Sequence, residues 1–248
     1  DTELTEAMSF CREKFNKNCT KSDLLNELQE NYEMKTIQPI EIDRREVSRE
    51  EFSKFVDATE YVTTAEKQGF AFFYTGFSQV KQQGYSWKGK NGAGAGKKPN
   101  FPANYLSLED AKAYCGWKNG RVPTAEEWEF AARGTTRRKF PWGNDWKVSN
   151  LAWNHKQAKL YPVNSYKKGN TPNGILNLAG NIAEWTVSAS RKGNILKGGS
   201  YLDENPTDFR SASWQAADPS KIFSHYGVRC VYDFKPETTS EPMSESVQ

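Results

Sequence analysis

Two helical stripes of apolar side chains run through residues 1–36. Their three- and four-residue spacing is the period of one face of an α-helix. The stripes are Leu4, Met8, Cys11 and Phe15, followed by Leu24, Leu25, Leu28 and Tyr32. We therefore predict an N-terminal helical hairpin. Cys11 and Cys19 lie near its connection, and a disulfide between them would stabilise the hairpin by about 2.5 kcal/mol.

Capping signals predict three further helices. A Ser or Thr followed three residues later by an acidic side chain satisfies two free backbone N–H groups at a helix start. The pattern begins at Ser48, Ser107 and Thr124, and the third helix should end at Gly134. A strand-like apolar run over 37–42 precedes the first helix.

The rest of the chain is rich in turn residues. From residue 141 onward, Pro, Gly and Asn clusters separate short apolar runs, which predicts short strands. The glycine-rich segment 89–98 lacks the spacing of a phosphate-binding loop, so we interpret it as a surface loop. The segment 234–248 is rich in Pro, Ser, Thr and Glu, and we predict a disordered tail there.

Composition narrows the class of protein. The chain has 248 residues and a net charge of +3; only 36% of its residues are hydrophobic, yet 13% are aromatic. No apolar stretch is long enough to span a membrane, and the overall charge is too small to indicate a nucleic-acid-binding protein. Few aliphatic and many aromatic residues favour a loop-rich domain with a core of large rings. The four cysteines show no CxxC spacing, which argues against zinc, and they allow three pairings into two disulfides.

Five segments, in order along the chain, together carry a family resemblance. They are Arg121–Gly134, Phe140–Asn144, Asn177–Trp185, Leu196–Tyr201 and Tyr226–Cys230. With them, the chain resembles the formylglycine-generating enzyme (sulfatase-modifying factor) family over about residues 37–232. The resemblance implies one asymmetric α+β domain with little regular secondary structure, related to C-type lectins. We place this FGE-sulfatase-like domain at 37–233, between the hairpin extension and the tail.

The resemblance also implies a disulfide pattern and a compartment. In the family, cysteines at the positions of Cys115 and Cys230 pair with each other, which leaves Cys11 to pair with Cys19. Two disulfides are typical of an oxidising compartment. We therefore expect a periplasmic or secreted protein.

A structural calcium site is a further expectation from the resemblance. The family motif maps onto Asn177, Gly180, Ile182 and Glu184, which would offer side-chain and backbone oxygens. Oxygen ligands of this kind suit Ca²⁺. The alternative is a tight turn in which Glu184 is exposed or forms a salt bridge.

The catalytic positions of the family have changed in this chain. The oxidase binds copper through two cysteines that follow the Gly-Gly-Ser segment, and soft Cu(I) needs such sulfur ligands. Here those positions hold Asp203 and Asp208, so we expect neither copper nor formylglycine-generating activity. Asp203, Asp208 and His225 would suit a different divalent metal, or they are polar side chains of a former groove. Trp214 lies either in the core or at the groove's rim.

We therefore predict a non-catalytic binding or regulatory module. It would engage a protein partner, such as a sensor kinase or a secretion-system component, through a groove formed by Asp203, Asp208, Trp214 and His225. One alternative is an enzyme with altered, metal-dependent oxidative chemistry of the kind found in siderophore maturation. A second alternative is calcium-dependent binding of a sugar or another small ligand.

Overall fold

The computed structural model describes most of the domain predicted by the sequence. It describes residues 5, 8–9, 36–74, 78–94, 96–154, 158–187 and 194–234. The predicted hairpin, the Cys11–Cys19 disulfide and the tail beyond residue 234 lie almost entirely outside the described residues. No helix in the described ranges is long and apolar enough to cross a membrane.

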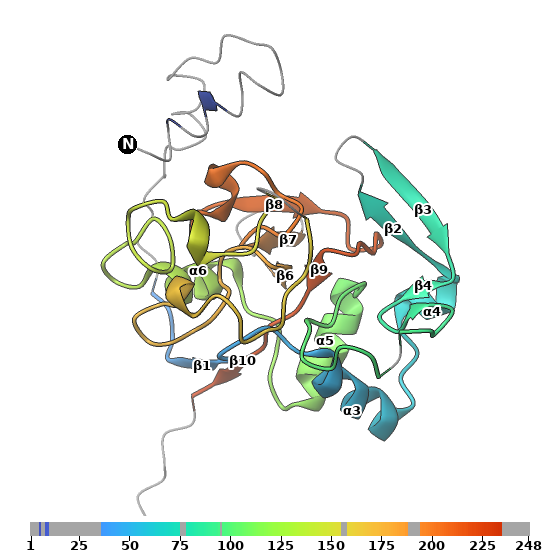
Figure 1. The fold of residues 1–248 in the computed structure, drawn as a ribbon. Helices are drawn as coiled ribbons and strands as arrows, with labels where there is room; N and C mark the ends of the chain where they lie inside the picture. The colour runs from blue at the N-terminus through green and yellow to red at the C-terminus, as the bar shows by residue number, and fades with distance from the viewer. Residues whose placement is uncertain are drawn as a thin grey trace, which may run out of the picture.

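The first and last described strands lie together. Strand β1 (Ile40–Ile42) pairs antiparallel with β10 (Val231–Asp233), so both ends of the domain meet at one edge (Figure 1). Helix α3 (Arg49–Thr59) follows, with a complete capping box at Ser48. A second capping box, at Thr63, starts the short helix α4 (Thr64–Gln68).

Two hairpins and two helices form the next part of the chain. Strands β2 (Phe70–Tyr74) and β3 (Gln79–Gln83) form an antiparallel hairpin at one side of the molecule (Figure 1), and β4 (Tyr85–Ser86) pairs with β5 (Gly89–Lys90). Helices α5 (Leu108–Trp117) and α6 (Ala125–Arg133) begin at capping boxes. The helix starts predicted at Ser48, Ser107 and Thr124 are therefore confirmed.

A four-stranded sheet holds the C-terminal half together. Its order is β8 (Trp214–Ala217), β7 (Asn194–Lys197), β6 (Ala183–Thr186) and β9 (Tyr226–Gly227). Strands β6 and β9 are parallel, and the other neighbours are antiparallel. Three 3-10 turns stand in the connections: η1 (Val148–Asn150), η2 (Lys167–Gly169) and η3 (Pro206–Phe209).

Aromatic rings dominate the core, as the composition indicates. Trp128, Trp185, Phe52 and Phe140 are completely buried, and rings pack against one another, as in the pairs Phe52–Tyr114 and Phe140–Trp146. Trp128 and Trp185 each donate an indole hydrogen bond inside the core, to Glu184 and to the carbonyl of Leu106. With small sheets, short helices and long connections, the domain is α+β with little regular structure, as expected.

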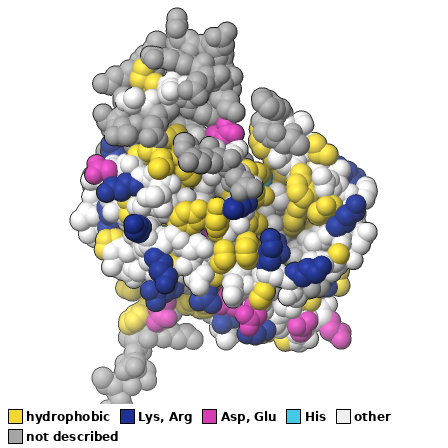
Figure 2. All heavy atoms as spheres, in the orientation of Figure 1, with side chains coloured by type: hydrophobic (Ala, Val, Ile, Leu, Met, Phe, Trp, Pro, Cys, Tyr) yellow, Lys and Arg dark blue, Asp and Glu magenta, His cyan; other side chains and the backbone are white. Residues whose placement is uncertain are grey.

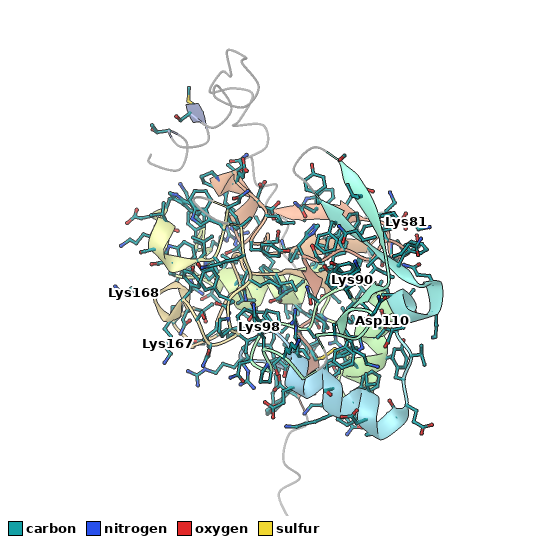
Figure 3. The ribbon with its side chains drawn as sticks, turned by 45° about the vertical axis from the view of Figure 1, so that its right-hand side comes forward. Lys81, Lys90, Lys98, Asp110, Lys167 and Lys168 are labelled. Carbon is teal, nitrogen blue, oxygen red and sulfur yellow. A yellow bond between two sulfur atoms is a disulfide. The ribbon has the colours of Figure 1, made fainter. Side chains whose placement is uncertain are left out.

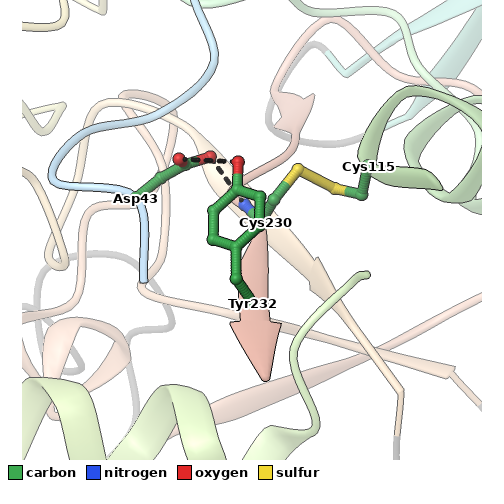
Figure 4. The surroundings of a disulfide bond; sticks show 4 residues. All are labelled: Asp43, Cys115, Cys230 and Tyr232. Atoms are coloured by element: carbon green, nitrogen blue, oxygen red, sulfur yellow. Dashed lines mark hydrogen bonds between the residues drawn. A yellow bond between two sulfur atoms is a disulfide. The ribbon is translucent and has the colours of Figure 1, made fainter. Parts of the chain in front are cut away.

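One disulfide fastens α5 to the chain just before β10. Cys115 and Cys230 are completely buried and bonded, with their Cα atoms 5.5 Å apart (Figure 4). Asp43 lies beside this bond, where its carboxylate accepts hydrogen bonds from the backbone N–H of Cys230 and from the hydroxyl of Tyr232. The structure thus contains the pairing that the family resemblance implied.

Candidate functional site

A double-glycine turn carries the chain out of β7 into the candidate site. Gly198 and Gly199 have φ values of 89° and 66°, which side chains rarely adopt. A Cβ at Gly198 would lie 3.1 Å from the ring of Trp128, and one at Gly199 would lie 2.8 Å from the ring of Phe209. Only glycine fits both positions, so these two glycines determine the path of the chain into Ser200 and the following loop.

The carboxylate of Asp203 stabilises this loop through hydrogen bonds. It accepts them from the backbone N–H (2.6 Å) and the hydroxyl (2.8 Å) of Ser200, and from Nε2 of Gln215 (3.3 Å). Burial raises the pKa of Asp203, and the hydrogen bonds from Ser200 and Gln215 oppose that rise. Both carboxylate oxygens therefore stabilise the loop. Asp208 lies farther on, within η3.

His225 stands on the other side of this region, just before β9. Its ring lies against the rings of Phe223 and Tyr226, with Tyr74 of the β2–β3 hairpin 6.5 Å away between centroids. Its Nδ1 is buried and has no hydrogen-bond partner among the described residues. Burial lowers the pKa of His225 to about 4, so the imidazole is neutral at pH 7.

The remaining groove candidate, Trp214, begins β8 and is 44% exposed. It therefore lies at the rim rather than in the core. Its neighbour Gln215 reaches Asp203, which joins β8 to the loop. Among the described residues, no three His, Cys, Asp or Glu side chains lie close enough to hold a metal ion. Asp203, Asp208 and His225 therefore do not form the metal triad considered from the sequence.

A second group of polar side chains is buried beneath the turn. Glu184 of β6 accepts hydrogen bonds from Arg229 (Nη2 at 2.7 Å, Nε at 2.9 Å) and from the indole N–H of Trp128 (2.6 Å). Arg229 also donates to the carbonyls of Asp43 and Leu176. Burial alone would lower the pKa of Arg229, but the carboxylate of Glu184 outweighs it and holds that pKa above its usual value.

Glu46 completes this group and is absent from the candidates suggested by the sequence. It is completely buried, and the side-chain amides of Asn177 and Asn181 each donate a hydrogen bond of 2.8 Å to it. Burial raises its pKa to about 7; Arg229 lowers it and Glu184 raises it further. Its position directly before the α3 capping box gives no signal that it is buried. We call Glu46, Glu184 and Arg229 the charge cluster.

Comparison with known proteins decides the family. The model of the sulfatase-modifying factor enzyme 1-like domain matches residues 14–234. This chain belongs to that family. It is 32% identical over 237 residues to the inactive C-alpha-formylglycine-generating enzyme 2 of Bos taurus, covering 79% of this chain and 77% of the relative. It is 30% identical to the formylglycine-generating enzyme of Thermomonospora curvata, covering 79% and 83%.

A solved structure supports the fold. PvdO from Pseudomonas aeruginosa superposes with a TM-score of 0.61 at 18% identity, covering 79% of this chain and 81% of that chain. At this identity the likeness concerns the fold alone. The expected architecture of the sulfatase-modifying factor family is therefore confirmed, and the chemistry has to be argued from the residues present.

The residues expected to bind calcium have protein partners in the described arrangement. Both carboxylate oxygens of Glu184 receive hydrogen bonds from Arg229, a positive group at the place where a cation would bind. Gly180 and Ile182 lie in the buried turn, and the amide of Asn177 donates to Glu46 and to the carbonyl of Val163. The salt-bridged alternative matches this geometry, and calcium remains a prediction from the resemblance.

Proposed function

We propose that this chain is a non-catalytic member of the sulfatase-modifying factor family that binds a segment of a partner protein in its former active-site groove. The observation that carries the proposal is the position of Asp203. By the family resemblance it occupies the position of the first copper-binding cysteine, and its carboxylate accepts hydrogen bonds from Ser200 and Gln215. A hard carboxylate held in this way is a poor ligand for Cu(I).

The groove has features that suit binding of a partner protein without catalysis of a reaction. Trp214 offers a half-exposed indole, and aromatic side chains at a rim are typical anchors of protein interfaces. His225 is neutral and packed among rings, so it adds an apolar surface with one unused polar atom. The relative named inactive supports this proposal by analogy. The buried disulfide between Cys115 and Cys230 is typical of an oxidising compartment, and we propose the periplasm or the extracellular space.

A peptide-oxidation assay tests the absence of chemistry. The protein is supplied with Cu(I), O₂ and a cysteine-containing peptide, beside the Thermomonospora curvata enzyme as a positive control. We expect no aldehyde product from this chain, because neither Asp203 nor Asp208 supplies a thiolate. Aldehyde formation at a rate within tenfold of the control would overturn the non-catalytic assignment. Stoichiometric bound iron with peptide oxidation would instead favour altered oxidative chemistry.

A binding experiment tests the groove itself. Partner proteins are captured from the native source with wild-type protein, with W214A and with F130A. Phe130 on α6 is a matched control, because it is 45% exposed and Trp214 is 44% exposed. We expect one partner whose recovery falls at least tenfold for W214A and stays within twofold for F130A. Equal recovery with both variants would show that the groove is not the binding site.

A further inference from the structure

Charge is segregated along this chain in a way that the net value of +3 conceals. The stretches 67–108 and 146–183 together hold eleven lysines, no arginine and no acidic residue. One residue in eight of the whole chain is acidic, so 80 residues would hold ten if acids were evenly spread. A local excess of positive or negative charge, rather than the total charge, sets the electrostatic potential at the surface where a charged partner binds.

The fold brings these two stretches together. The backbone N–H of Val163 donates to the carbonyl of Asn100 at 2.8 Å, which ties the segment before η2 to the loop that carries Lys97 and Lys98. The N–H of Lys97 donates to Gly94, and the N–H of Gly94 donates to Lys88, so this loop folds back on the β4–β5 hairpin. Figure 3 shows the labelled lysines strung from the β2–β3 hairpin across to η2.

The lysines on this side are exposed and form no ion pair with the residues that the structure describes. They are Lys81, Lys90, Lys97, Lys98, Lys159, Lys167 and Lys168. We call this set the lysine face. By contrast, Lys54 and Lys112 on helices α3 and α5 pair with neighbouring glutamates at 3.0 and 2.9 Å. The ammonium groups of the lysine face are thus available to an anionic partner.

Aromatic rings alternate with these lysines. Lys81 lies over the ring of Phe70 at 3.6 Å, and Lys159 lies over that of Tyr161 at 5.0 Å. Figure 2 shows the same alternation of dark blue and yellow side chains across the middle of the molecule, with acidic side chains mainly at its edges. A surface with cations beside apolar rings can bind the charged and the apolar side chains of one peptide.

We propose that the lysine face binds an acidic segment of a protein partner. This proposal rests on the proposed function, because it states the chemical class of the protein partner proposed there. All eleven cations of the two stretches are lysine. Ammonium groups complement carboxylates, and the rings beside Lys81 and Lys159 offer contacts to apolar side chains of the same peptide, which favours an acidic protein segment.

The lysine face adjoins the groove along the β2–β3 hairpin. Lys81 on β3 pairs in register with Phe72 on β2. Phe72 in turn packs its ring against Phe223, two residues before His225, with 5.5 Å between centroids. A bound peptide could therefore continue from the lysine face into the groove, which would let one partner engage both.

Two triple variants with the same change of charge test the proposal. K90Q/K98Q/K167Q removes three cations of the lysine face, and K54Q/K112Q/K118Q removes three exposed lysines on α3, on α5 and at the C-cap of α5. The probe is fluorescent poly-L-glutamate, titrated at low and at physiological salt. We expect the first triple to weaken binding at least tenfold and the second less than twofold, with wild-type binding weakened by salt.

Three results would overturn the proposal. Equal weakening by both triples would mean that only net charge matters. No binding of poly-L-glutamate at low salt would mean that the face does not take carboxylates. Single-stranded DNA or heparin binding at least tenfold more tightly, with the same lysine dependence, would assign another class of polyanion. W214A separates the two proposals, because it should leave poly-L-glutamate binding intact while lowering capture of the partner.

Discussion

The charge cluster and the groove are two polar regions whose hydrogen bonds and ion pairs span different separations along the chain. In the charge cluster, contacts join distant parts of the chain: Arg229 binds Glu184 across 45 residues, and Glu46 binds Asn181 across 135. Among the groove candidates, Asp203 binds Ser200 and Gln215, three and twelve residues away, and Nδ1 of His225 has no partner among the described residues. The contacts of the charge cluster thus span longer separations along the chain and hold the scaffold together.

Breaking the charge cluster should have the largest effect. R229M would leave Glu184 buried with only the indole of Trp128 as donor, and removing one partner of a buried ion pair costs about 3–5 kcal/mol. R45M is the control, because Arg45 forms an exposed pair with Glu51 that is worth at most about 1 kcal/mol. Urea unfolding measures both. A loss below about 1 kcal/mol for R229M would contradict the scaffold role.

Removing the disulfide beside the charge cluster should have the next largest effect. Cys115 and Cys230 are 115 residues apart, and a disulfide that closes a loop of this length stabilises by about 2–5 kcal/mol. We expect the C115A/C230A variant to lose stability in that range, as measured by the urea midpoint. If the variant retained full stability, the cluster alone would hold β10 in place.

The two regions should respond to pH with opposite signs. Burial raises the pKa of Glu46 from 4.5 to about 7, so its stabilising effect is complete below pH 4.5 and is lost as the pH rises through 7. Burial lowers the pKa of His225 from 6.5 to about 4, so its effect is complete above pH 6.5 and is lost as the pH falls towards 4. Each effect is at most roughly 3 kcal/mol, from about 1.4 kcal/mol per unit.

Two variants separate these responses. Between pH 5 and pH 8, the free energy of unfolding of E46Q should rise more, or fall less, than that of wild type. H225F should reduce the loss of stability between pH 6.5 and pH 4.5. Guanidinium unfolding at pH 4.5, 5, 6.5 and 8 measures both changes. Identical pH profiles for E46Q and wild type would show that Glu46 is already ionised or solvated in the folded protein.

Local signals in the sequence predicted much of the fold. The capping boxes at Ser48, Ser107 and Thr124 located three helices, because a helix start is determined by a few adjacent residues. Thr63 carries the same capping-box signal in the sequence, and α4 begins there. The family resemblance supplied the overall architecture, which no local pattern in so loop-rich a chain would have given.

The site was harder to predict because its decisive contacts are long-range. Nothing near Glu46 in the sequence indicates that two amides more than 130 residues away surround it. For Glu184, the sequence left calcium and a salt bridge open, since either would satisfy a buried carboxylate. The lysine face gives no signal in the total charge, because its signal lies in the distribution of acidic residues along the chain.

The pairing of β1 with β10 has a consequence for how the protein matures. During synthesis, β1 leaves the ribosome about 190 residues before its partner exists, a delay of roughly 10–40 s at typical elongation rates. Arg229, Cys230 and β10 all arrive at the end of this interval. Until then, the buried carboxylate of Asp43 lacks its hydrogen-bond donors, the backbone N–H of Cys230 and the hydroxyl of Tyr232. The domain should therefore complete folding only after residue 233 has been synthesised, and a nascent chain stalled before residue 229 should remain sensitive to protease.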